Sequence, residues 1–218
     1  MTASLYIIGA GGLGRDALGY ARELGRDDNG ATFTVAGFLD DRPDALAGFD
    51  VGTRVVSSLS NHVVDSSARY LIAIGEPRAR YRIATQLEAH GATFVTLIHP
   101  KAHLAPGATV GRGCIIAPFA FVGPSARIDD HVVINTYASA AHDAQIGKYV
   151  VFSPYAGITG TVTVEDGVFF GTHTTVAPGL RIGAWSKLGA GAVALHDMEP
   201  GTLAYGTPAR GSVKFAPP

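Results

Sequence analysis

The chain has 218 residues, a formal net charge of −1 and one cysteine, Cys114, so it is long enough for one large domain or two modest ones and has no intrachain disulfide. Its near-neutral charge argues against a nucleic-acid partner, which needs a surface that follows phosphates. The start of the chain lacks the basic segment of a signal peptide, and no stretch has the roughly 20 apolar residues that span a bilayer, so we expect a cytoplasmic protein with no membrane partner.

The first hundred residues alternate between strand and helix patterns. Short apolar runs at 4–10, 33–41, 69–77 and 93–100 are typical of buried parallel strands. Helical periodicity covers 13–24 and 78–91, where Gly91 ends the second helix. This order predicts an α/β fold over residues 1–98, a small Rossmann-like parallel sheet with helices on its faces.

The loop after the first strand, GAGGLG, has glycines at positions 9, 11 and 14. They satisfy G-x-G-x-x-G between a strand and a helix, where a phosphate can approach the backbone at the helix N-terminus. An acidic residue, Asp40, follows at the end of the second strand. Alone the motif is weak, because NAD-binding domains share it and a tight structural turn also explains it.

From Leu104 onward the chain repeats every six residues. Twelve of the sixteen first positions are Leu, Ile or Val, and the fifth positions are nearly always small or β-branched. This period is the signature of a parallel β-helix of hexapeptides, in which the first and fifth side chains fill a triangular prism and three hexads form a coil. We expect glycine at the second position to serve the corners, and we assign residues 99–218 to this all-β domain with its C-terminal tail.

The stretch YASAAHDAQIG interrupts the large aliphatic residues without breaking the frame. Ala140 occupies a first position, and His142 and Asp143 follow it. Histidine suits proton transfer near neutral pH, and a neighbouring carboxylate can orient the imidazole. The simpler interpretation is that His142 is a side chain at a corner of the coil without a catalytic role. Cys114 occupies an inward fifth position, which favours an inert core residue over an acyl-enzyme nucleophile.

Taken together, these motifs resemble the left-handed β-helix acyltransferases. More narrowly, the chain resembles nucleotide-sugar acetyltransferases with a Rossmann-like N-terminal domain, which include bacillosamine- and perosamine-type N-acetyltransferases and sialic acid O-acetyltransferases. The resemblance covers nearly the whole chain and rests on IIGAGGLGRDAL, GFLDD, LIAIGEPRARYRI, INTYASAAHDAQIGKYV and YGTPAR.

The resemblance implies the chemistry and the partners of the C-terminal half. It implies acetyl-CoA as cosubstrate, held in a groove between the β-helices of a homotrimer, and direct transfer with His142 as general base and Asp143 as its orienting neighbour. The amide of Gly160, eighteen residues beyond His142 and so one coil further, would stabilise the oxyanion. Further contacts with the cofactor map to Thr172 and Ala190, and no metal site is expected.

The resemblance also implies a nucleotide-linked amino-deoxysugar, with UDP or GDP as the nucleotide, in the N-terminal half. Its candidate contacts are Gly11, Gly12, Leu13, Asp40, Asp41 and Gly75. Three differences from relatives concern the sites: Leu13 stands where His or Phe is frequent, Glu76 and Pro77 where paired Asn is frequent, and Val151 where close relatives have a second histidine near the cofactor.

Three other functions stay open on the sequence. One is O-acetylation of a sugar hydroxyl, for example on a sialic acid. Another is an NAD-dependent oxidoreductase that uses the β-helix to oligomerise, although no candidate hydride-transfer residue is found. The third is a catalytically silent scaffold, which the His142–Asp143 pair argues against.

Overall fold

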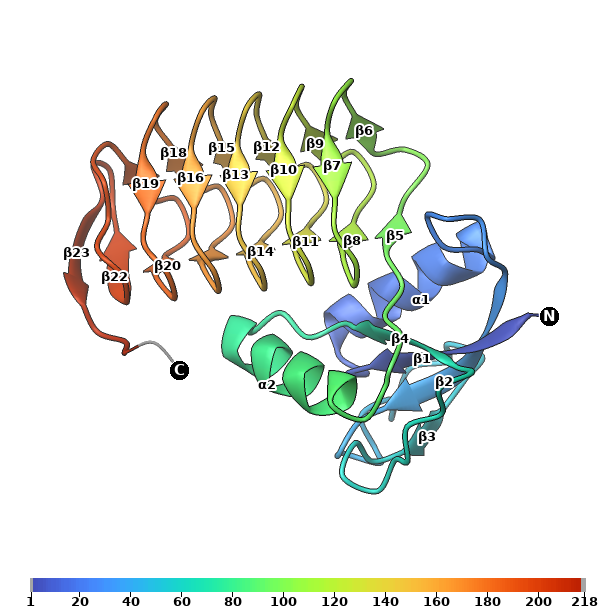
Figure 1. Ribbon diagram of the computed structural model, residues 1–218. Helices are drawn as coiled ribbons and strands as arrows, with labels where there is room; N and C mark the ends of the chain where they lie inside the picture. The colour runs from blue at the N-terminus through green and yellow to red at the C-terminus, as the bar shows by residue number, and fades with distance from the viewer. Residues whose placement is uncertain (1, 217–218) are drawn as a thin grey trace.

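The computed structural model describes residues 2–216, which form a small α/β part packed beneath one side of a long coiled β-helix (Figure 1). The α/β part contains a four-stranded parallel sheet with strand order β3-β2-β1-β4. Its elements are β1 (Ala3–Ile8), α1 (Gly12–Leu24), β2 (Phe33–Leu39), β3 (Val55–Ser57), β4 (Arg69–Ile72) and α2 (Pro77–Glu88). No helix in residues 2–216 is both long and apolar enough to cross a membrane.

Local chemistry explains where the two helices begin and end. Helix α1 starts after Gly11 and ends at Gly25, which has a φ of 62°, a conformation that glycine adopts without strain. Helix α2 starts with Pro77 in its first turn, and the Glu76 carboxylate accepts a 2.7 Å hydrogen bond from the Ala79 amide. Both helices were expected at these places.

The fourth strand of this sheet is not the one that we expected. Instead, β3 forms one edge of the sheet, although its sequence shows no clear apolar alternation. Of the predicted strand at 93–100, only a single bridge between Phe94 and Tyr70 joins the sheet, whereas β5 (Leu97–Ile98) pairs with β8 of the β-helix. An apolar run of this length fits either partner, and periodicity cannot separate them.

The C-terminal part is the expected parallel β-helix, built from three sheets with a register shift of eighteen residues, as between Val133 and Val151. We call the sheet that faces the α/β part the docked sheet. It contains β5, β8 (Ile115–Ile116), β11 (Val133–Ile134), β14 (Val151–Phe152), β17 (Phe169–Phe170), β20 (Lys187–Leu188), β22 (Thr202–Tyr205) and the antiparallel β23 (Arg210–Val213).

The other two sheets differ in the side chains that they turn outward. The uncharged sheet, with outward Ser139, Gly157 and Thr175, contains β6 (His103–Leu104), β9 (Phe121–Val122), β12 (Ser139–Ala140), β15 (Gly157–Ile158), β18 (Thr175–Val176) and β21 (Val193–Ala194). The polar sheet, with outward Arg127 and Arg181, contains β7 (Thr109–Val110), β10 (Arg127–Ile128), β13 (Gln145–Ile146), β16 (Thr163–Val164) and β19 (Arg181–Ile182).

First- and fifth-position side chains fill the prism, as predicted. One continuous cluster joins Ile116, Val122 and Ile134 to Cys114, Ala120 and their equivalents in later coils. Burial raises the pKa of the Cys114 thiol to about 12, so this cysteine is a protonated core residue. The combination of a large first-position and a small fifth-position side chain therefore follows from close packing inside the prism.

We expected glycine at the second hexad position because of the backbone conformation at the corners, and this reason was wrong. The left-handed conformation falls on the fourth hexad position, where ten residues other than glycine have φ near 60°, among them Tyr137 and Asp143. Second-position glycines are needed for space. A Cβ on Gly123 would lie 2.6 Å from the His142 amide nitrogen, and one on Gly171 2.6 Å from that of Ala190.

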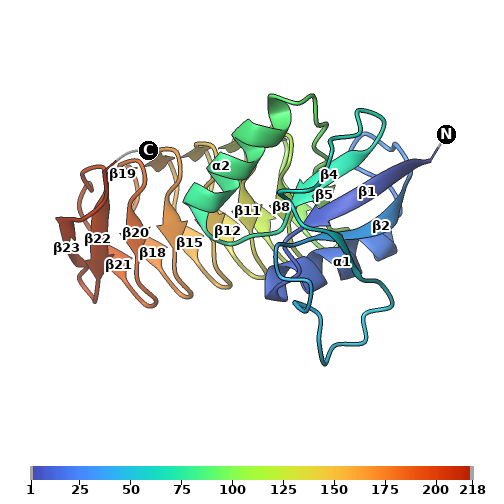
Figure 2. The ribbon, with the colours of Figure 1, turned by 90° about the horizontal axis from the view of Figure 1, so that it is seen from below.

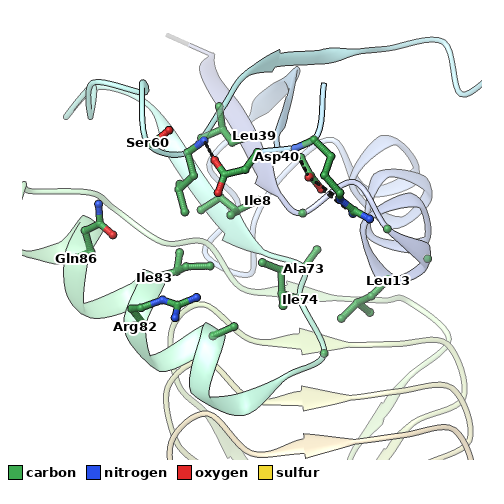
Figure 3. Close-up of a pocket in the computed structure, with 18 residues that line it drawn as sticks. Ile8, Leu13, Leu39, Asp40, Ser60, Ala73, Ile74, Arg82, Ile83 and Gln86 are labelled. Atoms are coloured by element: carbon green, nitrogen blue, oxygen red, sulfur yellow. Dashed lines mark hydrogen bonds and ion pairs between the residues drawn. The ribbon is translucent and has the colours of Figure 1, made fainter. Parts of the chain in front are cut away.

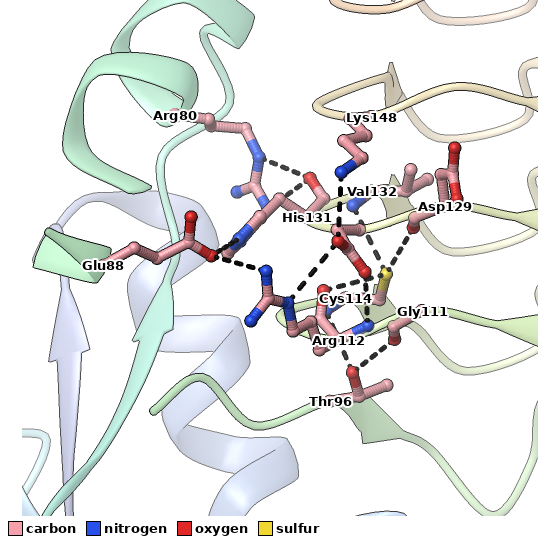
Figure 4. A network of polar contacts seen from close by, with 11 residues as sticks. Arg80, Glu88, Thr96, Gly111, Arg112, Cys114, Asp129, His131, Val132 and Lys148 are labelled. Carbon is pink, nitrogen blue, oxygen red and sulfur yellow. Dashed lines mark hydrogen bonds and ion pairs between the residues drawn. The ribbon is translucent and has the colours of Figure 1, made fainter. Parts of the chain in front are cut away.

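The α/β part covers the docked sheet through an apolar contact. Ile115, Val133 and Val151 point out of the prism and share a cluster with Leu5, Leu71 and other residues of the α/β part. Figure 2 shows the α/β part beside the β-helix from below. Helix α2 also covers one edge of the prism. Its Arg80 is fully buried and donates hydrogen bonds to the carbonyl oxygens of Ile72 and Ile74 in the α/β part and of His131 in the β-helix, the last shown in Figure 4. The two parts therefore meet in an interface that combines apolar contacts with hydrogen bonds.

A polar network surrounds Arg80 at this interface (Figure 4). His131 Nε2 lies 3.2 Å from Glu88 Oε1, and Arg112 joins Glu88 to Asp130. Burial, together with the Arg80 charge, lowers the pKa of His131 to about 4. His131 is therefore neutral at pH 7, and its role in this network is structural.

Candidate functional site

A pocket of about 650 Å³ opens at the carboxyl ends of the parallel strands of the α/β part (Figure 3). This edge is where ligands bind in open parallel sheets. The six residues assigned from sequence to a substrate site all line it: Gly11, Gly12, Leu13, Asp40, Asp41 and Gly75.

The glycines of this region fall into two kinds. A Cβ on Gly14 would lie 2.0 Å from the Gly9 carbonyl oxygen, and Gly9 itself has a φ of 96°, so the fold requires both glycines. A Cβ on Gly11, Gly12 or Gly75 would meet no atom within 4 Å, and none of these three has a positive φ. The fold therefore does not require glycine at the last three positions, which leave the backbone accessible from the pocket.

Asp40 is held in its ionised form at the end of β2. Its carboxylate accepts hydrogen bonds from the Ala10 amide at 2.9 Å and from the Arg42 amide at 3.0 Å, and it pairs with the Arg42 guanidinium at 3.2 Å. Partial burial acts to raise the Asp40 pKa, but these hydrogen bonds and the Arg42 charge outweigh it, so the pKa is lowered. Asp41 accepts from the Leu59 amide at 2.9 Å, which fixes one wall.

Sequence reasoning missed the wall that α2 contributes. Arg82, Ile83 and Gln86 line the pocket from this helix, and Ser60 lines it from the loop after β3. Figure 3 shows Arg82 reaching from α2 toward the cavity. Arg82 and Gln86 are four residues apart and so share one helix face, which the sequence shows. That this face borders a pocket follows only from the placement of α2.

His142 and Asp143 lie at the edge of the prism between the uncharged and polar sheets. His142 Nδ1 is 2.8 Å from Asp143 Oδ2, and the two side chains are 60% and 57% exposed. Asp143 has a φ of 59°, and in this corner the two adjacent side chains meet. The carboxylate can only accept, so the Nδ1 proton faces it and Nε2 has a free lone pair.

Gly160 lies one coil beyond His142, and the imidazole rests on it. A Cβ on Gly160 would lie 2.2 Å from His142 Nε2, so any side chain here would displace the ring. The Gly160 carbonyl accepts from the Gly179 amide at 3.1 Å, while its own N–H makes no backbone hydrogen bond among residues 2–216. His142, Asp143 and Gly160 therefore form one compact group.

Thr172 and Ala190 lie elsewhere. They occupy the edge between the docked and uncharged sheets, next to the stacked rings of Phe119, Tyr137, Tyr155 and His173. They therefore flank the uncharged sheet from the side opposite to Gly160. The eighteen-residue period relates residues along one edge, and Thr172 falls twelve residues beyond Gly160.

Val151 lies away from His142 within one chain. It sits on the docked sheet, buried against the α/β part. We expected its replacement of a second histidine to alter contacts with the thioester end of acetyl-CoA. Within one chain this position faces a different side of the prism.

The pocket and His142 of one chain are also on opposite sides of the prism. The α/β part covers the docked sheet (Figures 1 and 2), whereas His142 lies at the edge formed by the other two sheets. The pocket therefore does not adjoin the imidazole of its own chain.

Comparisons with known proteins place this arrangement among acetyltransferases. Residues 4–87 match the family described as the PglD N-terminal domain. The chain is 31% identical over 211 residues to a GDP-perosamine N-acetyltransferase of Escherichia coli O157:H7, a match that covers 94% of each chain.

Two solved structures share the fold over nearly the whole chain. One is the acetyltransferase domain of PglB from Neisseria gonorrhoeae FA1090 in complex with acetyl coenzyme A, with a TM-score of 0.85 and 29% identity, over 97% of this chain and 100% of that chain. The other is PerB from Caulobacter crescentus in complex with CoA and GDP-perosamine, with a TM-score of 0.84 and 29% identity, over 97% of this chain and 98% of that chain.

Proposed function

Since the chain belongs to the nucleotide-sugar N-acetyltransferases of the left-handed β-helix family, we propose that it transfers the acetyl group of acetyl-CoA to the amino group of a UDP- or GDP-linked amino-deoxysugar. The observation that carries this proposal is the His142–Asp143 pair resting on Gly160. In this proposal, residues 1–98 bind the nucleotide sugar and residues 99–218 bind acetyl-CoA and carry out the transfer.

His142 acts as the general base. The amine nitrogen attacks the thioester carbonyl carbon, and Nε2 takes the proton that the nitrogen loses. Asp143 Oδ2 accepts a hydrogen bond from the Nδ1–H group at a distance of 2.8 Å from Nδ1, keeps the imidazole in the required tautomer and stabilises the imidazolium. The C–S bond then breaks, and the imidazolium gives its Nε2 proton to the CoA sulfur, which leaves as the free thiol and returns His142 to its neutral form.

The Gly160 amide stabilises the negative charge that develops on the thioester oxygen. Its N–H is free of backbone partners, and the missing side chain lets the acetyl group and the imidazole approach the same spot. Thr172 and Ala190 contact the CoA arm from the other edge of the uncharged sheet.

The pocket holds the nucleotide sugar by its nucleotide. Within residues 2–216, the amides of Gly11, Gly12 and Leu13 have no hydrogen-bond partner at the start of α1, where no side chain caps the helix and no acidic residue occupies the first turn. A diphosphate is favoured there by the helix dipole. Asp40 and Asp41 bind ribose hydroxyl groups next to it, with Gly75 leaving room across the cavity.

The enzyme is a homotrimer in which a neighbour completes each active site. The pocket and His142 of one chain face away from each other, so the base must come from another copy. The uncharged sheet is the surface for this contact. It turns Ser139, Gly157, Thr175 and Val193 outward without a formal charge, whereas the polar sheet exposes Arg127 and Arg181.

The test is to follow free thiol release from acetyl-CoA with UDP-, GDP- and dTDP-linked aminosugars as acceptors. Sialic acid serves as the hydroxyl acceptor, and NAD binding is measured in parallel. We expect release that depends on an amino sugar and produces one N-acetyl group per thiol. Tight NAD binding with no turnover on any acceptor would overturn the proposal.

A pair of glycine variants separates ligand contact from folding. Gly12→Ala is expected to keep the melting temperature within about 2 °C of wild type, because its Cβ meets open space, yet to weaken nucleotide-sugar binding about tenfold. Gly14→Ala is expected to lower stability by about 1–3 kcal/mol, because its Cβ would overlap the Gly9 carbonyl. Thermal melts and calorimetric titrations measure both, and equal affinity of Gly12→Ala and wild type would contradict the assignment.

A further inference from the structure

The pocket has two chemically different ends. The loop end consists of Gly11, Gly12 and Leu13, and the helix end consists of Arg82, Ile83 and Gln86 on α2. Figure 3 shows Leu13 and Gln86 on opposite sides of the cavity, with Ala73 and Ile74 between them. A ligand that fills about 650 Å³ touches both ends.

Two arginines, Arg42 and Arg82, line the pocket, and they differ in their partners. Arg42 is occupied by Asp40 at 3.2 Å. In the part of the chain that the structure describes, Arg82 makes no ion pair and no hydrogen bond, although it lines the cavity. An unpaired guanidinium in a pocket offers up to five N–H donors to a ligand and no acceptor.

The walls beside Arg82 are apolar. Ile8, Leu39 and Ile83 line the cavity between the sheet edge and α2 (Figure 3), and Leu59 also lines it. All four are buried or half-buried aliphatic side chains. Such a slot suits a flat heteroaromatic ring whose edge makes the polar contacts.

On the basis of the proposed function, we propose that the helix end binds the nucleobase and that Arg82 reads its keto oxygen. In the proposed function the diphosphate binds at the start of α1, at the other end of the pocket. The nucleoside then extends past Asp40 and Asp41 toward α2.

Donor chemistry gives this contact its selectivity. Guanine and uracil present an acceptor oxygen at purine position 6 or pyrimidine position 4, whereas adenine and cytosine present an amino group there. A guanidinium donates to the first kind and opposes the second, because two donors cannot pair. Gln86, one turn further along α2, has both a donor and an acceptor and adapts to the neighbouring ring atoms.

Calorimetric titration of the full-length protein with GDP, UDP, ADP and CDP tests this inference without acetyl-CoA. We expect GDP or UDP to bind at least about tenfold more tightly than ADP and CDP. Arg82→Ala is expected to abolish this preference, with ADP and CDP affinities changed less than about threefold. Arg82→Lys keeps the charge but loses the planar fork, and is expected to restore only part of the preference.

Arg78→Ala is the matched control. It removes the same charge from the same helix outside the pocket, and the preference is expected to persist. Equal weakening of all four nucleotides by Arg82→Ala would assign Arg82 to the diphosphate and overturn the inference, as would a wild-type protein without preference. Thiol release with an unchanged base preference in Arg82→Ala would overturn this inference alone, whereas absence of both nucleotide binding and thiol release would overturn the proposed function.

Discussion

Replacement of His142 by alanine is expected to lower kcat for acetyl transfer by about 10²–10⁴-fold, the usual contribution of a positioned general base. In the proposed mechanism the imidazole receives the amine proton, and it is the side chain that lies against Gly160. The KM for the nucleotide sugar is expected to change little, because the pocket lies on the α/β part. Steady-state thiol release over a range of both substrates gives the two constants.

Two further variants make this result specific. His173→Ala removes another exposed histidine from a neighbouring edge, where it stacks on Tyr155, and is expected to keep near wild-type kcat. Asp143→Asn is expected to lower kcat about 10–100-fold, because the imidazole keeps its place but loses the partner that fixes its tautomer. A kcat of His142→Ala within about threefold of wild type would contradict the assignment of the base.

The largest effect on stability is expected from Arg80→Met. The substitution keeps much of the side-chain volume but leaves the carbonyls of His131, Ile72 and Ile74 without their donor in a buried site. Each unpaired buried acceptor costs about 1–3 kcal/mol, so the free energy of unfolding is expected to fall by about 3 kcal/mol or more. For a chain of this size that lowers the melting temperature by roughly 6–12 °C.

Arg112→Met is the matched control for this prediction. Arg112 pairs with Glu88 and Asp130 in the same network but is 61% exposed, so its loss is expected to cost at most about 1 kcal/mol. Thermal unfolding of both variants measures the difference. Equal melting temperatures for the two would show that the Arg80 hydrogen bonds do not hold the α/β part to the β-helix.

Period and composition were enough to predict the β-helix, whereas the role of Gly160 beside His142 came from the resemblance, with which the period agrees. A fixed repeat of eighteen residues places Gly160 directly beyond His142, whatever the details of packing. The same repeat relates Thr172 to Ala190 but places them on a different edge. The expectation that they act together with His142 came only from the resemblance, and in the proposed trimer a second copy of the chain brings the two edges together.

Other features depend on tertiary contacts that a single sequence does not contain. The run at 93–100 could pair with either sheet, and only the geometry of the connection joins Leu97 to the β-helix. Arg82 is one of several arginines on α2, and its sequence position does not distinguish it from Arg78. The docking of α2 over the sheet edge turns Arg82 toward the pocket and places Arg78 over Trp185.

Mixed assembly of two inactive variants tests most directly whether the pocket of one chain works with His142 of another. His142→Ala lacks the base, and Gly12→Trp fills the nucleotide pocket. Co-expressed in equal amounts and purified together, they are expected to recover about a quarter of wild-type thiol release, because random assembly gives that share of sites both intact parts. Each variant alone is expected to be inactive. Mixed assemblies that form but show no more activity than the separate variants would contradict an active site shared between neighbouring copies.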